Sequence, residues 1–521
     1  MRLTISQKRS AFRGVDNRRL ILWLGLPAAG CLIIQFALGA SPWVILLAAS
    51  IVATGLAGFA FTGVYSVASW LALFYVLGNV LVPVYAKTAM GQSLDSHLYS
   101  PLDSFLVLAV CSAELLIALI LAKQVPVGKR LLRATADPRS LRWLSWGSFF
   151  LGLAFWFANF RFQGPGGSGF GGIAAFRDLV FMAIIARTAL VLETSDNRRT
   201  IDFVVVIMIA AAILLGLLTN SKTYAALPVV SYFATLFFYL RRIPARHIAA
   251  LIIGSAIFLT IFTPLIQAWR YLGQQQMPLE RRISLMESTM TSIIEGHQFE
   301  YYVYLEKIQF QGGYYDYFGG NGRGQVVLGR YASVQQIDPV INEINRQGTL
   351  GGDAIWPDLT ILLPKVVYPA KPEYPVAYHL LVDLGLINPN GGKYPTVPLA
   401  GQAYAGYGAF GVLVIPFLTF LGFLLALKKI GWNLYRNVYA IFFLCDFMIV
   451  YAGQGALGQY AGAVLRNFPL FMIIFFVLGK LGVIGVRRPR VYWQKISSPR
   501  AVHLVLFGRP VGSSRSKREC R

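Results

Sequence analysis

Apolar runs of about twenty residues recur along almost the whole chain, and each is long enough to cross the ~30 Å hydrocarbon core of a bilayer as a helix. Inside lipid the backbone N–H and C=O groups must pair with one another, so such runs are expected to fold as helices. The runs cover residues 20–40, 43–62, 67–85, 105–122, 144–160, 179–193, 201–219, 224–240, 248–268, 407–427, 438–452 and 468–486. The sequence therefore predicts an all-α polytopic membrane protein with about twelve transmembrane helices.

Composition agrees with a lipid-embedded chain. Hydrophobic residues make up 56% of the sequence and charged residues only 13%, whereas soluble domains carry roughly 25% charge. The net charge of +24 could suggest nucleic acid. The basic residues are concentrated in short segments between the apolar runs and in the two termini, which is the pattern of charge retained on the cytoplasmic side. We therefore expect membrane lipids and no nucleic acid among the partners.

The distribution of basic residues also predicts the orientation. A basic segment precedes the first apolar run, which is longer than the h-region of a signal peptide and favours an uncleaved first span. Threading the chain alternately through the membrane assigns the basic segments 123–142, 198–199, 241–246 and 428–436 to the cytoplasm. Both termini are then cytoplasmic. The sixth run is short and contains Arg187, so a re-entrant element is an alternative there.

This threading divides the chain into five parts. They are a cytoplasmic N-terminus (1–19), nine transmembrane helices (20–268), a large extracytoplasmic loop between the ninth and tenth helices (269–404), three further helices (405–486) and a basic, flexible cytoplasmic tail (487–521). A loop of this size is too long for a connector and is expected to carry function. It contains no cysteine, so we predict neither a disulfide nor a metal site in it.

Four cations lie at the predicted outer ends of the helices, against the usual topological bias: Arg161, Arg177, Lys222 and Arg270. Each alone could reach the lipid headgroups from a helix end. Together they resemble a site for an anionic headgroup such as a lipid diphosphate. The glycine-rich segment 161–172 lies between the first two and could offer backbone N–H groups to a phosphate.

The large loop adds further candidates. Lys365 and Lys371 stand beside prolines, which restrict the backbone and would lower the entropy cost of binding an anion. Glu373, His379 and His297 are the candidates for proton transfer from an attacking sugar hydroxyl, with ordinary structural roles as the alternative.

Aromatic residues form a cluster in the same loop. Tyr314, Tyr315 and Tyr317 have flat rings with polar tips, which suit the apolar faces and hydroxyls of sugars. An aromatic belt at the membrane interface explains such residues equally well.

Two ionisable residues, Arg187 and Asp446, fall within predicted spans. Intramembrane charges usually face the bundle interior and pair. We expect a structural ion pair between them, with a proton relay as the alternative.

Three segments resemble the Wzy family of O-antigen and oligosaccharide-repeat polymerases. Leu363-Pro-Lys365 through Lys371-Pro372 resembles the family's Pro-Arg, aromatic-Pro and Lys-Pro signature, with lysine where arginine is commoner. Residues 398–411 resemble the small-residue start of the following span, and Asn220-Ser-Lys222 resembles a Gly-Ser-Arg turn. The many spans and the major loop late in the chain agree.

The resemblance implies transfer of a growing glycan from one undecaprenyl diphosphate carrier to the nonreducing end of another lipid-linked repeat unit, at the outer leaflet of the bacterial inner membrane. Arg270, His379, Glu373 and His297 would be catalytic, and Arg161, Arg177, Lys222, Lys365 and Lys371 would bind the diphosphate. Tyr314, Tyr315 and Tyr317 would contact sugar. No metal or cofactor is implied. Chain-length regulators and flippases are expected partners.

Other functions fit the same organisation. An O-antigen ligase would pass the glycan to a different acceptor, and a GT-C glycosyltransferase would use a monophosphate lipid donor. The paired acids that a GT-C enzyme carries in its first outer loop are missing, since that loop has only Asp95 and Asp103, well separated. A lipid or polysaccharide transporter or flippase is the non-enzyme alternative, and it would need polar residues at mid-membrane.

Overall fold

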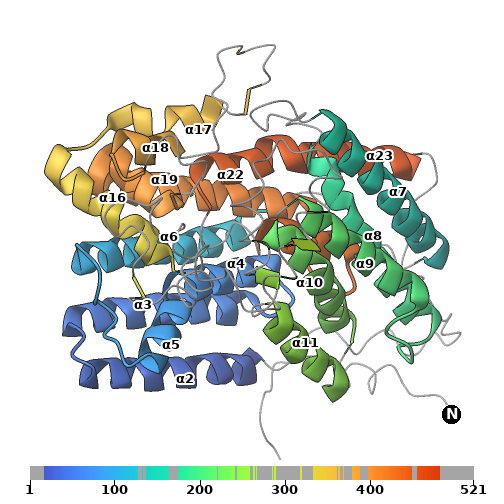
Figure 1. Cartoon of the computed structure of the whole chain (residues 1–521), viewed down its shortest axis with the longest axis horizontal. Helices are drawn as coiled ribbons and strands as arrows, with labels where there is room; N and C mark the ends of the chain where they lie inside the picture. The colour runs from blue at the N-terminus through green and yellow to red at the C-terminus, as the bar shows by residue number, and fades with distance from the viewer. Residues whose placement is uncertain are drawn as a thin grey trace, which may run out of the picture. The chain divides into compact units, whose positions relative to one another are not determined.

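The computed structural model (Figure 1) describes residues 17–126, 132, 137–162, 174–219, 221–240, 243–258, 262–263, 266, 284, 287–288, 291, 317–318, 332–360, 362–363, 368, 378–387, 397–448 and 455–480. Within these ranges the regular structure is helical, apart from an isolated bridge between Ser66 and Asn433. Six helices are long and apolar enough to cross a membrane: Leu20–Ala37, Pro42–Thr62, Val67–Ala89, Pro101–Gln124, Leu399–Ile430 and Leu457–Lys480. The chain is a helical membrane protein, as the sequence predicts.

Along the chain the described elements occur in the following order. They are α2 (Asn17–Ala37), α3 (Pro42–Thr62), α4 (Val67–Val76), η1 (Leu77–Leu81), α5 (Val82–Ala89), α6 (Pro101–Gln124), α7 (Pro138–Phe162), η2 (Ala174–Asp178), α8 (Leu179–Thr194), α9 (Phe203–Leu218), α10 (Lys222–Tyr239), α11 (Ala245–Ile257), α16 (Ser333–Gln347), η6 (Gly351–Ala354), α17 (Trp356–Thr360), α18 (Tyr378–Asp383), α19 (Leu399–Ile430), α20 (Val438–Phe443), η7 (Leu444–Met448), α22 (Leu457–Gly462), η8 (Ala463–Asn467) and α23 (Phe468–Lys480).

Within the described residues, a helical segment falls on each predicted apolar run, but the boundaries differ at the C-terminal end of the fold. The tenth run begins at Tyr407, whereas α19 begins at Leu399 and breaks at Tyr407 and Gly408, where the backbone leaves helical geometry. Gly408 has a φ of 59°, which glycine adopts without strain. The last run begins at Phe468, whereas the helix begins at Leu457. Hydropathy marks the apolar core of a span and misses its polar ends.

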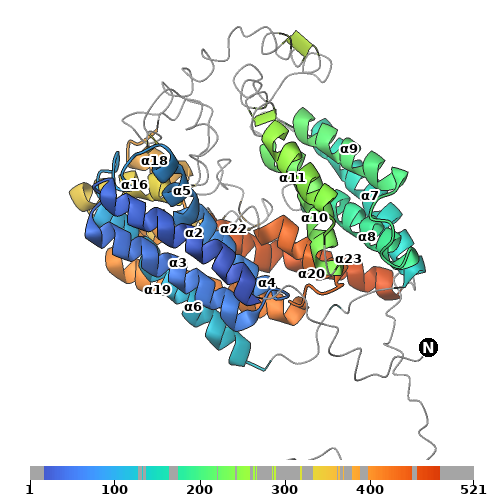
Figure 2. The ribbon, with the colours of Figure 1, turned by 90° about the horizontal axis from the view of Figure 1, so that it is seen from below.

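Figure 2 shows two groups of helices. One contains α2, α3, α4 and α6 with α19, and α6 packs along α3 and α19. The other contains α7, α8, α9 and α10 with α11, and α8 packs against α7, α9 and α10. The segment formed by α20 and η7 touches both groups, because it contacts α8 and α10 on one side and α4 on the other. The two groups therefore share a packed interior.

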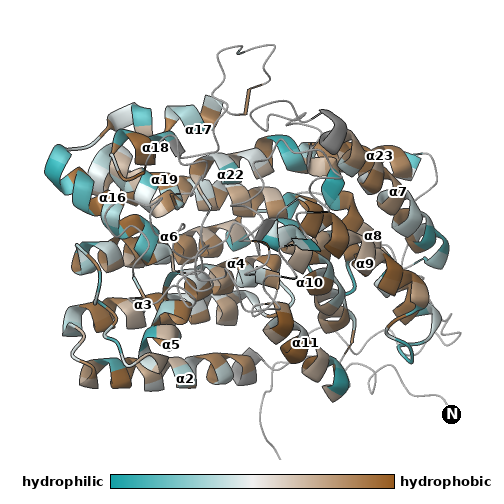
Figure 3. Cartoon of the chain, in the orientation of Figure 1, coloured by the Kyte–Doolittle hydropathy of each residue, from teal (hydrophilic) through white to brown (hydrophobic). Residues whose placement is uncertain are grey.

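Apolar side chains cover much of the outside of these helices. Trp23 is 78% exposed, Phe203 77% and Ile33 74%, which suits a surface solvated by lipid. Figure 3 shows hydrophobic residues along α9, α10 and α11, whereas α16 carries many hydrophilic ones. Helix α8 differs, since its residues are almost all buried by its neighbours. Its shortness is thus compatible with a position inside the bundle.

Chain segments predicted to lie on the same side of the membrane meet in the structure. On the predicted inner side, Lys428 Nζ donates to the carbonyl oxygens of Ala122 at 2.7 Å, Lys123 at 2.9 Å and Val125 at 2.7 Å, which caps the C-terminus of α6. On the predicted outer side, Asp338 of α16 accepts hydrogen bonds at the start of α6. These contacts agree with the alternate threading of the chain.

Candidate functional site

The structure describes four of the predicted site residues with their side chains: Arg177, Lys222, Tyr317 and His379. Arg161 lies in the last turn of α7, and its side chain is outside the described part. The remaining candidates lie outside the described residues, namely Arg270, His297, Tyr314, Tyr315, Lys365, Lys371 and Glu373. The geometry of the site is therefore built around Arg177.

Arg177 lies in η2, the short 3₁₀ segment that leads into α8. Its Nε donates to the Tyr224 hydroxyl at 2.9 Å and its Nη2 to the same oxygen at 2.5 Å. The guanidinium carbon stands 4.3 Å from the centre of the Tyr224 ring and 5.7 Å from that of Trp156. Two aromatic faces and one hydroxyl thus hold a planar cation in a fixed orientation. The side chain is 26% exposed.

Two acids complete what we call the Arg177 cluster: Trp156, Arg177, Asp178, Tyr224 and Asp446. Asp178 Oδ1 lies 3.7 Å from Arg177 Nε, and Asp446 is within electrostatic range of both. Both carboxyl groups are buried. Burial raises the pKa of Asp178 above its ordinary value, while the Arg177 guanidinium and a hydrogen bond with Tyr224 oppose that shift. A carboxylate with a raised pKa is a stronger base than an ordinary aspartate.

The cluster lies near the ends of two helices that carry other predicted cations, Lys222 and Arg161. Lys222 is the first residue of α10, two residues before Tyr224, and Ser221 caps this helix by accepting from Tyr224 N at 3.3 Å. Arg161 follows Trp156 on α7 by little more than one helical turn. Three cations distant in sequence therefore have their backbones at one end of the α7, α8 and α10 bundle.

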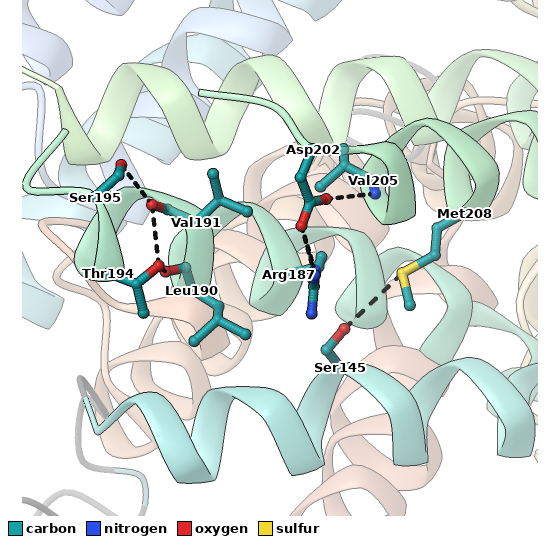
Figure 4. Close-up of polar contacts among 9 residues, drawn as sticks. All are labelled: Ser145, Arg187, Leu190, Val191, Thr194, Ser195, Asp202, Val205 and Met208. Atoms are coloured by element: carbon teal, nitrogen blue, oxygen red, sulfur yellow. Dashed lines mark hydrogen bonds and ion pairs between the residues drawn. The ribbon is translucent and has the colours of Figure 1, made fainter. Parts of the chain in front are cut away.

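The expected ion pair between Arg187 and Asp446 is wrong. Arg187 Nε and Nη2 both donate to Asp202 Oδ2, at 2.9 Å and 2.5 Å (Figure 4). Asp202 Oδ1 also accepts from Val205 N at 2.8 Å and so caps the N-terminus of α9. The long arginine side chain reaches the helix end, where the acid already has a capping role. Asp446 belongs to the Arg177 cluster instead.

Tyr317 is an interior residue. It is 1% exposed, and its hydroxyl donates to the Leu94 carbonyl oxygen at 2.7 Å. The buried ammonium of Lys87 lies 4.3 Å from the centre of its ring. Burial raises the pKa of the Tyr317 phenol, and the charges of Asp95 and Asp338 add to this. Because the Tyr317 side chain is buried and its hydroxyl is already hydrogen-bonded, it does not form part of a sugar-binding surface.

His379 lies on α18, half-buried, with its Nε2 3.2 Å from the carbonyl oxygen of Asp353. A carbonyl only accepts, so Nε2 must carry the hydrogen and Nδ1 is the acceptor of the neutral ring. Helix α18 packs with α16 and η6 through Leu380 and Leu381. None of these elements contributes a residue to the Arg177 cluster.

Sequence reasoning missed Asp178 and Tyr224 as members of the site. A signal was present, since Asp178 follows Arg177 directly and an acid beside an outer cation is unusual at a membrane surface. Tyr224 offered no comparable signal. Its role depends on α10 packing against α8, which periodicity alone does not predict.

The position of Tyr224 depends on Gly216, where α9 crosses α10. A Cβ at this residue would stand 2.4 Å from Ala225 N and 2.6 Å from Tyr224 C, so the two backbones would have to separate. We expect Gly216→Ala to lower stability by about 1–3 kcal/mol through overpacking and to move Tyr224 away from Arg177. Thermal unfolding of the purified protein in detergent measures the loss.

The matched control is Gly147→Ala in α7, where a Cβ would meet nothing within 4 Å. This variant should unfold at or slightly above the wild-type temperature, because alanine favours helix. Equal unfolding temperatures for the two variants would show that α9 and α10 are not in close contact at Gly216.

Comparison with protein-family models, with curated proteins and with solved structures finds no match for this chain. The function must therefore be argued from the arrangement of its residues.

Proposed function

We propose that this chain is a membrane glycosyltransferase that polymerises undecaprenyl diphosphate-linked oligosaccharide repeat units into O-antigen or exopolysaccharide. The observation that carries the proposal is the Arg177 cluster. A partly exposed guanidinium is held rigidly by Trp156 and Tyr224, close to the start of α10 with Lys222 and the end of α7 with Arg161. A preorganised cation of this kind suits the diphosphate of a lipid carrier.

The chemistry is a displacement at an anomeric carbon. A hydroxyl of the acceptor sugar attacks this carbon, the bond to the diphosphate oxygen breaks, and the electron pair leaves with the diphosphate. Arg177 and its neighbouring cations would stabilise the negative charge that develops on the leaving group. The hydroxyl proton needs an acceptor. Asp178 is buried next to Arg177 and joins His379, Glu373 and His297 as a candidate base.

The proposed setting is the bacterial inner membrane, with about twelve spans and both termini in the cytoplasm. The meeting of Lys428 with the end of α6, and of Asp338 with its start, supports this threading. It puts the Arg177 cluster and the loop from 269 to 404 on the extracytoplasmic side, where lipid-linked repeat units would be joined.

A transporter or flippase is the second candidate, and a separate observation favours it. The spans are interrupted by π-helical segments at η1, η7 and η8, and π segments often mark functional sites. Buried polar atoms without hydrogen-bond partners accompany one of them, at Asn79. Interrupted helices with polar groups are typical of transport pathways. Glycan polymerisation remains the main proposal because a fixed guanidinium suits a diphosphate leaving group.

A reconstitution experiment separates the candidates. Purified protein in liposomes would receive synthetic undecaprenyl diphosphate-linked repeat units, and the products would be resolved by size. We expect a ladder of longer glycans that remain on the lipid. Movement of the lipid across the bilayer without new glycosidic bonds would identify a flippase. Transfer to a different acceptor would identify a ligase, and a requirement for a monophosphate donor a GT-C enzyme.

A further inference from the structure

A small cavity lies in the interior of the helix group formed by α4, α6, α19 and α22. Its volume is about 10 Å³, and its wall includes Tyr75, Asn79, Leu399 and Tyr460. Asn79 belongs to η1, the π-helical segment that interrupts the third span, and Leu399 is the first residue of α19. The cavity thus lies between η1, the π-helical part of the third span, and the start of α19, the helix that follows the large predicted loop.

The cavity wall carries polar atoms that have no protein partner. Neither Nδ2 nor Oδ1 of Asn79 makes a hydrogen bond in the part of the chain that the structure describes, and the residue is only 1% exposed. The Tyr75 hydroxyl lacks one as well, at 5% exposure. The adjacent Cys111 thiol is a weak hydrogen-bonding group and does not replace that partner. Each unpaired group costs about 1–3 kcal/mol when buried.

We propose that a single buried water molecule occupies this cavity and links Asn79, Tyr75 and the first turn of α19. A cavity of about 10 Å³ is the size that holds one water, provided that several polar partners surround it. The amide and the phenol provide both donors and acceptors. At the start of α19, Leu399 N already donates to the Gly455 carbonyl oxygen at 2.9 Å. The N–H of Ala400, which also lines the cavity, has no partner within the helix and adds a donor.

A cation fits this cavity less well than water. In the described part of the chain, no carboxylate lines the cavity. Glu114 lies near Tyr75 but does not form part of the wall. The N-terminus of α19 carries a positive partial charge, which repels a cation and favours the oxygen of a water molecule. The inference is independent of the proposed enzymatic activity. Its consequence is structural: the water holds the π-helical segment of the third span against the start of α19.

Radiolytic footprinting of the purified protein in detergent tests the proposal. X-ray radiolysis of a bound water produces hydroxyl radicals at the site, so we expect hydroxylation of the Tyr75 ring several times faster than that of a buried tyrosine with no adjacent water. Tyr317 is the matched internal control. It is 1% exposed, its hydroxyl donates to the Leu94 carbonyl oxygen at 2.7 Å, and it does not line this cavity. Equal labelling of Tyr75 and Tyr317 would overturn the proposal.

Two further measurements sharpen the result. Asn79→Leu replaces the amide with an apolar group of similar size, so labelling of Tyr75 should fall to the level of Tyr317. The wild-type comparison stands even if this variant fails to fold. Replacing sodium and potassium chloride by choline chloride should leave the unfolding temperature of the wild type unchanged. A marked decrease would indicate a bound metal cation and contradict the water.

Discussion

For the proposed polymerase activity, replacing Arg177 by alanine should reduce glycan polymerisation at least about 100-fold, the loss expected when one preorganised charge donor is removed from a developing anion. Water that enters the vacated space would not carry the positive charge that the guanidinium holds beside the Trp156 and Tyr224 rings. Arg177→Lys keeps the charge but not the planar fork that donates twice to Tyr224. We therefore expect it to recover only part of the activity. The measurement is the size distribution of glycan made in liposomes from lipid diphosphate-linked repeat units.

The comparison needs a cation that lies away from the cluster. Arg346 on α16 is 70% exposed and pairs with Glu343 on the same helix, so Arg346→Ala should leave polymerisation unchanged. Each variant is first checked for folding by its unfolding temperature and by gel filtration. Wild-type polymer from folded Arg177→Ala protein would remove Arg177 from the active site. Loss of activity in both variants would instead point to a general effect of basic charge.

The helices of this fold could be predicted from the sequence because the length and apolar composition of a run are enough to identify a membrane helix. The runs at 43–62 and 105–122 match α3 and α6 closely. The interruptions could not be predicted. A π turn such as η1 depends on how Asn79 and its neighbours pack against α6 and α19, and hydropathy is insensitive to an extra residue in a turn.

The candidate site was predictable only in part, for a related reason. Charge at an outer helix end identified Arg177, but its partners come from helices whose adjacency the sequence does not specify. The predicted partner of Arg187 was Asp446, whereas the structure pairs it with Asp202. Asp202 precedes an apolar run and is followed by Val205, so it could have been identified as a helix cap. Consecutive helices are usually neighbours, which makes Asp202 a better partner than the distant Asp446.

The largest expected effect on stability is at Asp338, which joins α16 to the start of α6. Its Oδ2 accepts from Tyr99 N at 2.7 Å, and its Oδ1 accepts from Ser100 N at 2.8 Å and Ser104 Oγ at 3.0 Å. A carboxylate from α16 thus caps α6, with 1% of the residue exposed. Asp338→Ala leaves buried donors without an acceptor and should cost about 3 kcal/mol or more. Thermal or denaturant unfolding in detergent measures this loss.

Asp103 provides the matched control, because it is another acid at the start of α6 that bonds to α16. Its Oδ2 accepts from Asn345 Nδ2 at 3.2 Å, at an exposed position. Water can replace this partner, so Asp103→Ala should cost no more than about 1 kcal/mol. Asp338→Asn retains one acceptor oxygen and should lie between the two. Equal destabilisation by Asp338→Ala and Asp103→Ala would mean that the Asp338 carboxylate does not cap α6.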